Sequence, residues 1–357
     1  MPRVYGCGSN HLNTISPCSN LLVCNEPTLV VDQDAQLIDA NWSQTLVRQP
    51  NGTLDVVTSI PSSSTPPSSC SIQQWLGKDS FTHWLNHNHH VCTLDPVNNN
   101  NTVVLTSIDQ FQLVNVNSRG EFLGLIKSNS HYQIILYPNS NSIINHVPQP
   151  TIISQHMTDE FVKIKAGAAH FLLLTAKGSV YSVGDNRFNQ LGLLPHEKTS
   201  SRNALTLIEG FQGLTSPVID ICCGDFHNVA LTKQGDGYVF GDDRRGQCGG
   251  LTDETGQLQL IQLTNNNNNN SDTYNDDEPI IKFISCGTNH TVLVTNDNQV
   301  FVTGCNNYGQ LGQLEHRQTT LDNDMFVRQF VISESLSSLG IITKVIATRN
   351  KTFVQIS

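Results

Sequence analysis

Charged residues are scarce in this sequence of 357 residues, and the basic ones are the scarcer kind. They make up 14% of the chain, with 20 Lys and Arg against 30 Asp and Glu, so the net charge is −10. The Lys and Arg residues form no basic stripe. Because affinity for duplex nucleic acid comes largely from neutralising phosphates, we expect no direct binding to nucleic acid.

Long apolar runs are also missing. The sequence has no stretch of about 18 apolar residues that could cross a bilayer. Residues 1–10 lack the apolar centre of a secretory signal peptide. We therefore expect no association with a membrane, and a nuclear or cytoplasmic location rather than secretion.

The sequence motifs of common catalytic sites are absent. We find no phosphate-binding Gly-rich loop, no nucleophile elbow and no H-E-x-x-H pair. Acidic pairs such as Asp242-Asp243 and Asp276-Asp277 fall on turns or in a low-complexity insert, which argues against a catalytic dyad. The sequence therefore predicts no enzyme activity and no cofactor.

Metal and disulfide patterns are equally poor. The ten cysteines include no C-x-x-C pair, and Cys223 and Cys286 take a position that Ala166 fills in another copy of a repeat, so we interpret them as small buried residues. A zinc site could be considered where one short stretch concentrates possible ligands, namely His83, His87, His89, His90 and Cys92. Their spacing fits no known zinc finger. A polar loop next to a strand is the favoured interpretation, and no metal is expected.

What the sequence does contain is one pattern written three times, in residues 162–192, 219–249 and 282–312. A Gly lies three residues before a central His and another lies fourteen residues after it; the sets are Gly167, His170 and Gly184, then Gly224, His227 and Gly241, then Gly287, His290 and Gly304. Short apolar strands joined by Gly or Asn turns predict an antiparallel meander. One meander cannot bury both of its faces, so repeated meanders favour a β-propeller.

The order G-x-x-H, strand, turn, strand, G-x-N-x-x-x-Q-L-G resembles the regulator of chromosome condensation repeat family, whose members are β-propellers. The resemblance is specific in the three clear copies, about a hundred residues. It implies seven blades of about fifty residues each, and 357 residues accommodate seven. Six blades are the alternative, because only six starting positions are recognisable: residues 44, 112, 170, 227, 290 and 351.

Degraded copies extend the pattern to both ends. Gln44, Gln112 and Lys351 occupy the His position, with Gly52 and Gly120 eight residues after the first two. Residues 4–10 match residues 180–186, so we expect the N-terminal strand to complete the last blade and close the ring. A divergent blade is expected within residues 60–110. The whole chain, 1–357, is thus predicted to be one monomeric propeller with low-complexity loops at about 61–69 and 265–278.

The repeated residues are expected to serve the repeat rather than catalysis. We expect each His ring to hydrogen-bond backbone groups at a blade junction. Asn186, Asp243 and Asn306 are expected to close Asx-type turns. The loops after each third strand vary, and Arg and aromatic residues at their tips are typical protein-binding anchors; these are Arg187, Phe188, Arg244, Arg245 and Tyr308. Simple solvated turns are the alternative.

These features together predict a non-enzymatic propeller that docks a protein partner on one loop face. Within the family, the chain resembles most the propeller that accompanies a JmjC-type oxygenase in chromatin regulation, which would make such an oxygenase the partner. The alternative is guanine-nucleotide exchange on a small Ran-like GTPase, the activity of the founding member of the family. The degraded repeats make that alternative weaker, and fold alone does not decide function.

Overall fold

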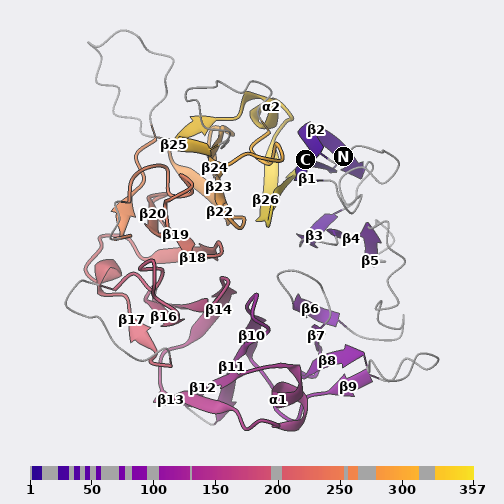
Figure 1. Ribbon diagram of the computed structural model, residues 1–357, viewed down its shortest axis with the longest axis vertical. Coiled ribbons are helices and arrows are strands. Elements are labelled where there is room, and N and C mark those ends of the chain that lie inside the picture. Colours follow the sequence, from indigo (N-terminus) through magenta and orange to yellow (C-terminus); the bar gives the residue numbers. More distant parts are fainter. Residues whose placement is uncertain are drawn as a thin grey trace.

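The computed structural model describes residues 2–9, 23–31, 36–40, 45–48, 54–57, 72–76, 83–94, 104–128, 131–193, 203–252, 256–263, 279–312 and 326–357. In these residues the strands form seven antiparallel sheets arranged in a ring (Figure 1). Six sheets have four strands and one has three. The chain is therefore an all-β, seven-bladed propeller, which confirms the favoured blade count over the alternative of six. We number the blades 1 to 7 in chain order, beginning with the sheet β3-β4-β5.

Blades 1 to 3 include the part of the sequence in which the repeat is hardest to recognise. Their strands are β3 (Gln36–Ala40), β4 (Thr45–Arg48), β5 (Leu54–Val57), β6 (Ile72–Leu76), β7 (His83–Asn86), β8 (Val91–Leu94), β9 (Val104–Thr106), β10 (Leu113–Val116), β11 (Phe122–Ser128), β12 (His131–Tyr137) and β13 (Thr151–Met157). The four strands β6 to β9 form blade 2, so the divergent blade lies where the sequence predicted it. The two predicted low-complexity loops, as well as Gln44 and Gly52, lie outside the described residues.

Blades 4 to 6 are the three clear copies of the repeat. Their strands are β14 (Phe161–Ala166), β15 (His170–Thr175), β16 (Val180–Gly184), β17 (Thr206–Leu207), β18 (Val218–Cys223), β19 (His227–Thr232), β20 (Gly237–Gly241), β21 (Gln259–Leu260), β22 (Ile281–Cys286), β23 (His290–Thr295), β24 (Val300–Cys305) and β25 (Phe326–Ile332). The sequence pattern therefore marks the first three strands of each blade, and the fourth strand follows a variable loop.

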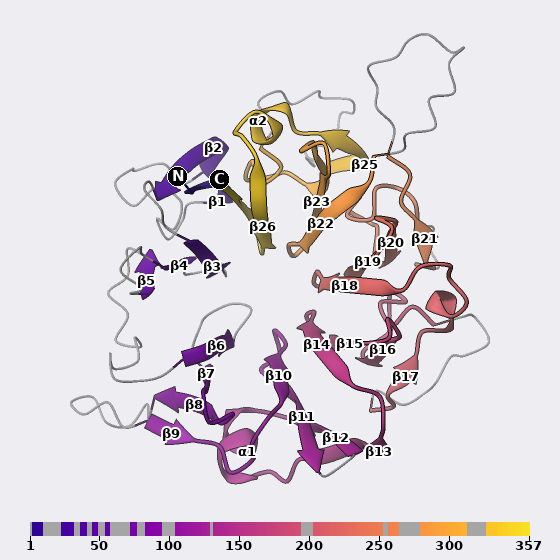
Figure 2. The ribbon, with the colours of Figure 1, turned by 180° about the vertical axis from the view of Figure 1, so that it is seen from behind.

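Blade 7 joins the two ends of the chain. It combines β26 (Ile342–Thr348) and β27 (Lys351–Ile356) with β1 (Arg3–Ser9) and β2 (Val23–Val31), in the order β2-β1-β27-β26. Strand β1 runs antiparallel to β27 from the pair Arg3–Ile356 to the pair Gly8–Lys351. Both ends of the chain lie beside this sheet when the ring is viewed from either side (Figures 1 and 2). The predicted closure by the N- and C-terminal strands is confirmed.

The core lies between neighbouring blades rather than inside any one of them. The second strand of a blade is packed on both faces, and β15, β19, β23 and β27 are buried at all six positions. One apolar cluster joins blades 5 and 6, where Val229 and Leu231 of β19 meet Leu293 of β23 and Phe301 of β24. Because each blade covers the next, the ring can bury apolar surface that a lone sheet would expose.

Residues 138–150 contain helix α1 (Ser140–Asn145), whose first turn is capped by the side chain of Asn139. One local prediction is wrong. The repeat around Gln112 was placed one strand too early in the chain, because β10 is the first strand of blade 3 and not the second. Strand β10, which follows Gln112, lies beside β14 at the centre of the ring, and Gly120 lies in the turn from β10 to β11 rather than in the next turn. The remaining short helices are α2 (Glu334–Ser337) and the 3-10 helix η1 (Glu209–Phe211).

A candidate partner-binding face on the repeat loops

Each repeated His joins its blade to the following blade. The Nε2 atom of His170 lies 2.7 Å from Oδ1 of Asn228, that of His227 lies 3.0 Å from Oγ1 of Thr291, and that of His290 lies 3.1 Å from Oγ1 of Thr352. The partner is always the second residue of the next blade's second strand. The junction was expected, with backbone groups as partners. The Nε2 partners are side chains, and His290 also has a hydrogen bond to the backbone of Lys351 in the next blade.

The same partner residues reach back to the preceding blade a second time. Asn228 Nδ2 donates to the carbonyl oxygen of Gln190 at 2.8 Å. Thr291 Oγ1 and Thr352 Oγ1 donate to the carbonyl oxygens of Gln247 and Gln310, both at 2.7 Å. Because the threonine hydroxyl hydrogens are used in these bonds, the imidazole Nε2 atoms must donate. The Nε2 atoms of the repeated histidines are therefore used in joining blades. For His290, burial lowers the pKa to about 3, so this ring is neutral.

The Gly three residues before each His makes room for the imidazole ring. A Cβ atom placed on Gly167, Gly224 or Gly287 would lie 2.0 Å from the Cε1 atom of the His in the same blade. Gly184, Gly241 and Gly304 have φ values of 124°, 104° and 98°, which other residues rarely adopt. The G-x-x-H and final Gly of the pattern thus follow from packing and from backbone conformation.

The Gln and Asn of the motif shape the loop that follows the third strand. Gln190 Oε1 accepts a hydrogen bond from the backbone N–H of Phe188 at 2.8 Å, and Asn186 Oδ1 accepts one from Leu191 at 2.9 Å. The equivalent side chains in blades 5 and 6 hold Arg245, Cys248, Tyr308 and Leu311 in the same way. The side chains of Gln190, Gln247 and Gln310 are buried, so they hold each loop rigidly. The two residues at the tip of each loop, which we call its display positions, are 187 and 188, 244 and 245, and 307 and 308.

In blades 4 and 5, the Asx-type turn is closed by the residue just before the predicted one. Asp185 Oδ1 accepts from the N–H of Arg187 at 3.0 Å, and Asp242 Oδ1 accepts from the N–H of Arg244 at 3.1 Å. Asn186, Asp243 and Asn306, which were expected to close these turns, instead span the loop to the residue five positions later. The preceding Asp therefore sets the direction of the first displayed residue.

All five predicted partner-binding residues occupy the two display positions. Arg187 and Arg244 hold the first position in blades 4 and 5, while Phe188, Arg245 and Tyr308 hold the second in blades 4, 5 and 6. The side chains of Arg187 and Arg244 are 61% and 67% exposed, and Tyr308 is 39% exposed. These residues are thus on the surface, as a binding role requires.

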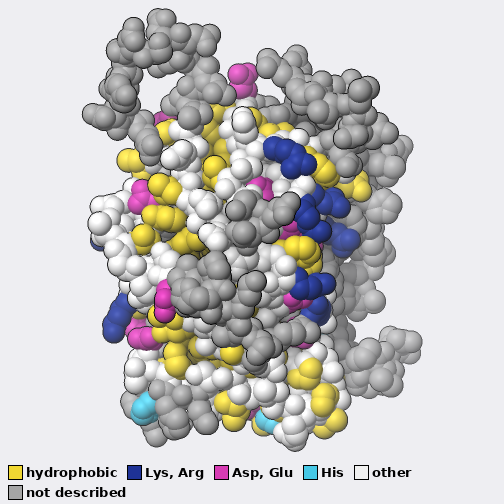
Figure 3. Space-filling view, turned by 60° about the vertical axis from the view of Figure 1, so that its left-hand side comes forward, with side chains coloured by type: hydrophobic (Ala, Val, Ile, Leu, Met, Phe, Trp, Pro, Cys, Tyr) yellow, Lys and Arg dark blue, Asp and Glu magenta, His cyan; other side chains and the backbone are white. Residues whose placement is uncertain are grey.

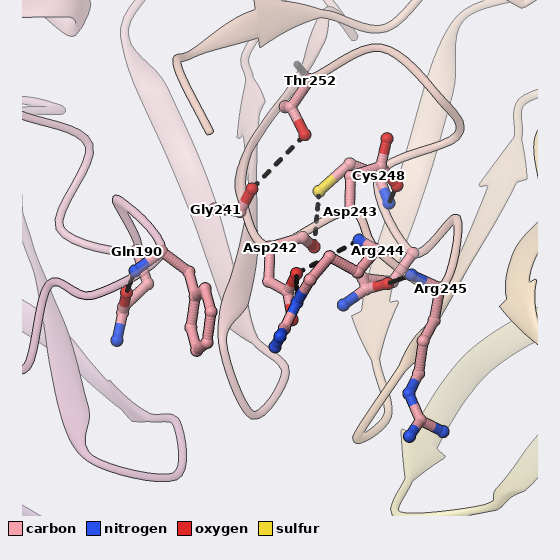
Figure 4. Close-up of polar contacts among 10 residues, drawn as sticks. Gln190, Gly241, Asp242, Asp243, Arg244, Arg245, Cys248 and Thr252 are labelled. Carbon is pink, nitrogen blue, oxygen red and sulfur yellow. Dashed lines mark hydrogen bonds and ion pairs between the residues drawn. The ribbon is translucent and has the colours of Figure 1, made fainter. Parts of the chain in front are cut away.

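The structure brings three of the five together, namely Arg187, Phe188 and Arg244. The guanidinium carbon of Arg244 lies 4.0 Å from the ring centroid of Phe188 on the neighbouring blade. The Arg187 guanidinium lies 5.8 Å from the same ring and 5.8 Å from Phe226, and Arg245 lies 5.5 Å from Phe326. Figure 4 shows Arg244 turned toward Asp242, while Arg245 extends away from the loop.

Two buried carboxylates orient these guanidinium groups. Arg244 donates through Nε and Nη2 to both oxygens of Asp242, at 2.8 and 2.9 Å. Asp185 Oδ2 accepts from Arg187 Nε at 2.8 Å and from Arg119 Nη2 at 3.3 Å. Burial by itself would favour the neutral acid at Asp242, but the hydrogen bonds from Arg244 outweigh it and hold the pKa of Asp242 below its ordinary value.

We call this surface the arginine face, and it consists of Arg119, Arg187, Phe188, Phe226, Arg244, Arg245 and Phe326. Elsewhere on the described surface, Lys and Arg side chains lie along one side of the view in Figure 3, with Asp and Glu side chains among them. Sequence reasoning missed Arg119, Phe226 and Phe326, which lie outside the repeat loops. It also missed the role of Asp185 and Asp242, although an Asp at the same position of two copies was a usable signal.

The other candidate sites have structural explanations. His89 Nδ1 lies 3.1 Å from the carbonyl oxygen of Phe111, and His90 Nδ1 lies 2.8 Å from that of Ser107. Within the described ranges, no three His, Cys, Asp or Glu side chains are grouped so that they could hold a metal ion. Seven cysteines are buried and form no disulfide: Cys7, Cys92, Cys222, Cys223, Cys248, Cys286 and Cys305. No helix in the described part of the chain is long and apolar enough to span a bilayer.

Comparison with known proteins agrees with the repeat pattern. Two family models described as the regulator of chromosome condensation (RCC1) repeat match the chain, one at residues 161–190, 218–247 and 281–310 and the other at 177–231. The first matches begin at the first strand of blades 4, 5 and 6 and end at Gln190, Gln247 and Gln310. Blades 4 to 6 of this chain are therefore RCC1 repeats.

Curated relatives share part of this RCC1 repeat region. The Xenopus laevis protein named regulator of chromosome condensation is 31% identical over 171 residues, which cover 48% of this chain and 36% of that protein. The Danio rerio protein RCC2 homolog is 35% identical over 147 residues, which cover 41% of this chain and 26% of that protein. The match therefore spans about a third of these relatives or less.

Solved structures match the RCC1-type propeller over its whole length. Human WBSCR16 covers 100% of this chain with a TM-score of 0.66 and 14% identity. Prp20p from Saccharomyces cerevisiae, described with its binding to Gsp1p and histones, covers 99% with a TM-score of 0.62 and 13% identity. At these identities the comparison shows the fold alone.

Proposed function

We infer that this protein is a non-enzymatic interaction propeller that docks a protein partner on the arginine face. The observation that carries this proposal is the stacking of Arg244 on Phe188 across a blade junction, with Arg244 largely exposed. A charged side chain held in place at the surface is ready to bind, because its ordering entropy is lost before the partner arrives. Arg and aromatic residues also dominate the energetics of protein interfaces.

The support beneath this surface favours the same role. The loops of blades 4 and 5 are fixed by side-chain hydrogen bonds to buried Gln residues, and the blades themselves are joined through His170 and His227. Rigid loops on a rigid scaffold are where propellers and barrels place their binding residues. Both the scaffold and the displayed residues are therefore suited to recognition.

Affinity capture from a cell extract tests the proposal. The bait is the full chain, compared with a variant carrying Arg187→Ala, Arg244→Ala and Arg245→Ala. A matched control carries Lys177→Ala and Lys233→Ala, which remove exposed positive charge from the turns after the second strands, at the opposite end of the blades. We expect the first variant to lose its specific partner and the control to keep it. Retention by the first variant would show that the partner binds elsewhere.

Two partners are specific enough to test directly. The closer sequence resemblance suggests a JmjC-type oxygenase, for which co-purification from the same extract is the test. The alternative function is exchange of guanine nucleotide on a small Ran-like GTPase. It is supported by the similarity to the Xenopus laevis protein, which is 31% identical over 171 residues. A nucleotide-release assay with a Ran-like GTPase distinguishes them, since faster release supports exchange and an unchanged rate supports an interaction role only.

A further inference from the structure

In the arginine face, the negative charges are buried and the positive charges are exposed. The side chains of Asp185 and Asp242 are only 9% and 5% exposed, whereas those of Arg119, Arg187 and Arg244 are 38%, 61% and 67% exposed. The carboxylates thus lie beneath the guanidinium groups. A partner approaching from solvent meets the cations first, although the chain as a whole carries a net charge of −10.

The guanidinium groups keep hydrogen-bond donors for a partner. The paired contact between Arg244 and Asp242 uses Nε and Nη2, so the two N–H groups of Arg244 Nη1 take no part in it. Arg187 contacts Asp185 through Nε, which leaves both of its Nη groups outside that contact. Planar guanidinium groups bind carboxylates through two parallel N–H···O bonds.

The stacking on aromatic rings fixes the planes of these donors. Arg187 and Arg244 lie on the same Phe188 ring, at 5.8 and 4.0 Å from its centroid. Two guanidinium groups that share one ring are close enough for neighbouring carboxylates of one short peptide to reach both. Phe188 is half-buried, so it also offers an apolar edge between the two charged sites.

We propose that the arginine face binds a short acidic segment of a protein partner, with Asp or Glu carboxylates paired to Arg187 and Arg244 and additional contacts at Arg119 and Arg245. This proposal rests on the proposed function and adds the chemistry of the partner. A nucleic-acid duplex is a worse fit. Its phosphates extend along a regular backbone, and the cations here form a small cluster rather than an extended groove.

Fluorescence anisotropy with a defined probe tests the proposal. The probe is a labelled decapeptide rich in Glu and Asp, and its control is the same peptide with Gln and Asn in their place. We expect the acidic peptide to bind at least tenfold more tightly than the neutral one. The double variant Arg187→Ala with Arg244→Ala should bind the acidic peptide at least tenfold more weakly than the wild type. The double variant Lys177→Ala with Lys233→Ala should bind it with an affinity within twofold of the wild type.

Wild-type protein in rising salt gives a second measurement that does not depend on the folding of any variant. Because the contacts are between exposed charges, the affinity for the acidic peptide should fall by at least tenfold between 50 and 500 mM salt. No detectable binding of the acidic peptide, equal binding of both peptides, or tighter binding of a duplex oligonucleotide of equal charge would overturn the proposal.

The capture experiment separates the two proposals. If the captured partner depends on the arginine face while the peptide experiment fails, the acidic segment is wrong and the interaction role stands. If capture does not depend on the arginine face, the proposed function itself fails.

Discussion

The imidazole Nε2 of His227 donates to the hydroxyl of Thr291 on the next blade, and that hydroxyl in turn donates to the carbonyl oxygen of Gln247 in the blade of His227. One buried hydroxyl therefore ties the second strand and the loop of blade 5 to blade 6. His170 with Asn228 and His290 with Thr352 repeat the arrangement. The loops that carry the arginine face depend on these junctions for their position.

Replacing His227 by Ala should lower the free energy of unfolding by about 2 to 3 kcal/mol, because it leaves a cavity and removes the partner of a buried hydroxyl. A double-mutant cycle with Thr291→Val, measured by urea unfolding, should show a coupling of about 1 kcal/mol. The control cycle pairs His227→Ala with Thr352→Val, a residue of another junction. We expect additivity there. Additivity in the first cycle would mean that the hydrogen bond contributes nothing.

Gly224→Ala should destabilise the propeller more than Gly120→Ala. A Cβ atom at Gly224 would lie 2.0 Å from the His227 ring, whereas one at Gly120 would meet nothing within 4 Å. We expect a loss of at least about 2 kcal/mol for the first and of about 1 kcal/mol for the second, which has φ of 78°. Thermal melting of both variants measures this, and the reverse order would contradict the packing explanation.

Deleting residues 1–10 should lower the melting temperature by on the order of 10 °C, because β27 would lose one of its two strand partners and β2 would lose its link to blade 7. A synthetic peptide of residues 1–10 serves as the control, since adding it to the truncated protein should restore part of the loss. A truncated protein that melts like the full chain would argue against closure by the terminal strands.

The stability of the propeller should depend on the ionisation of His290. Its pKa is about 3 in the folded chain, mainly because burial excludes water, and about 6.5 when unfolded. The unfolded chain therefore binds a proton as the pH falls below about 6.5 while the folded chain does not, and stability declines by up to about 1.4 kcal/mol per pH unit.

His290→Gln removes that proton-binding site. By urea unfolding, the stability of the wild type relative to this variant should decrease by about 2 kcal/mol between pH 7 and pH 5. Buffers of constant ionic strength keep other electrostatic effects equal for both proteins. A difference that stays constant over this range would mean that His290 is not held neutral by burial.

The sequence was sufficient to predict the strand positions in the blades whose second strand begins with His. There the Gly before the His, the His itself and the Gln of the loop are all required by packing, so the pattern survives. Around Gln112 the prediction was displaced by one strand because blade 3 lacks both the Gly and the His of the pattern. The chain turns there through Asn117 and Glu121, whose side chains hydrogen-bond each other. Without the His there was no marker for the start of the second strand.

Contacts between blades were harder to predict than contacts within them. Arg244 and Phe188 are separated by a whole repeat, and only the ring geometry brings them together. One signal was nevertheless present. The residue after the His position is polar in Asn228, Thr291 and Thr352, which follow blades with a His, but it is Phe171 after blade 3, which has none. The choice of that residue depends on the preceding blade.

Hydrogen–deuterium exchange on the complex with the captured partner tests the central claim most directly. The account predicts slower exchange in residues 185–191 and 242–248, the loops of the arginine face, relative to the free protein. Residues 176–178 and 233–235, the turns at the opposite end of the same blades, should exchange equally in both states. Protection confined to those opposite turns, with none in the two loops, would contradict the account.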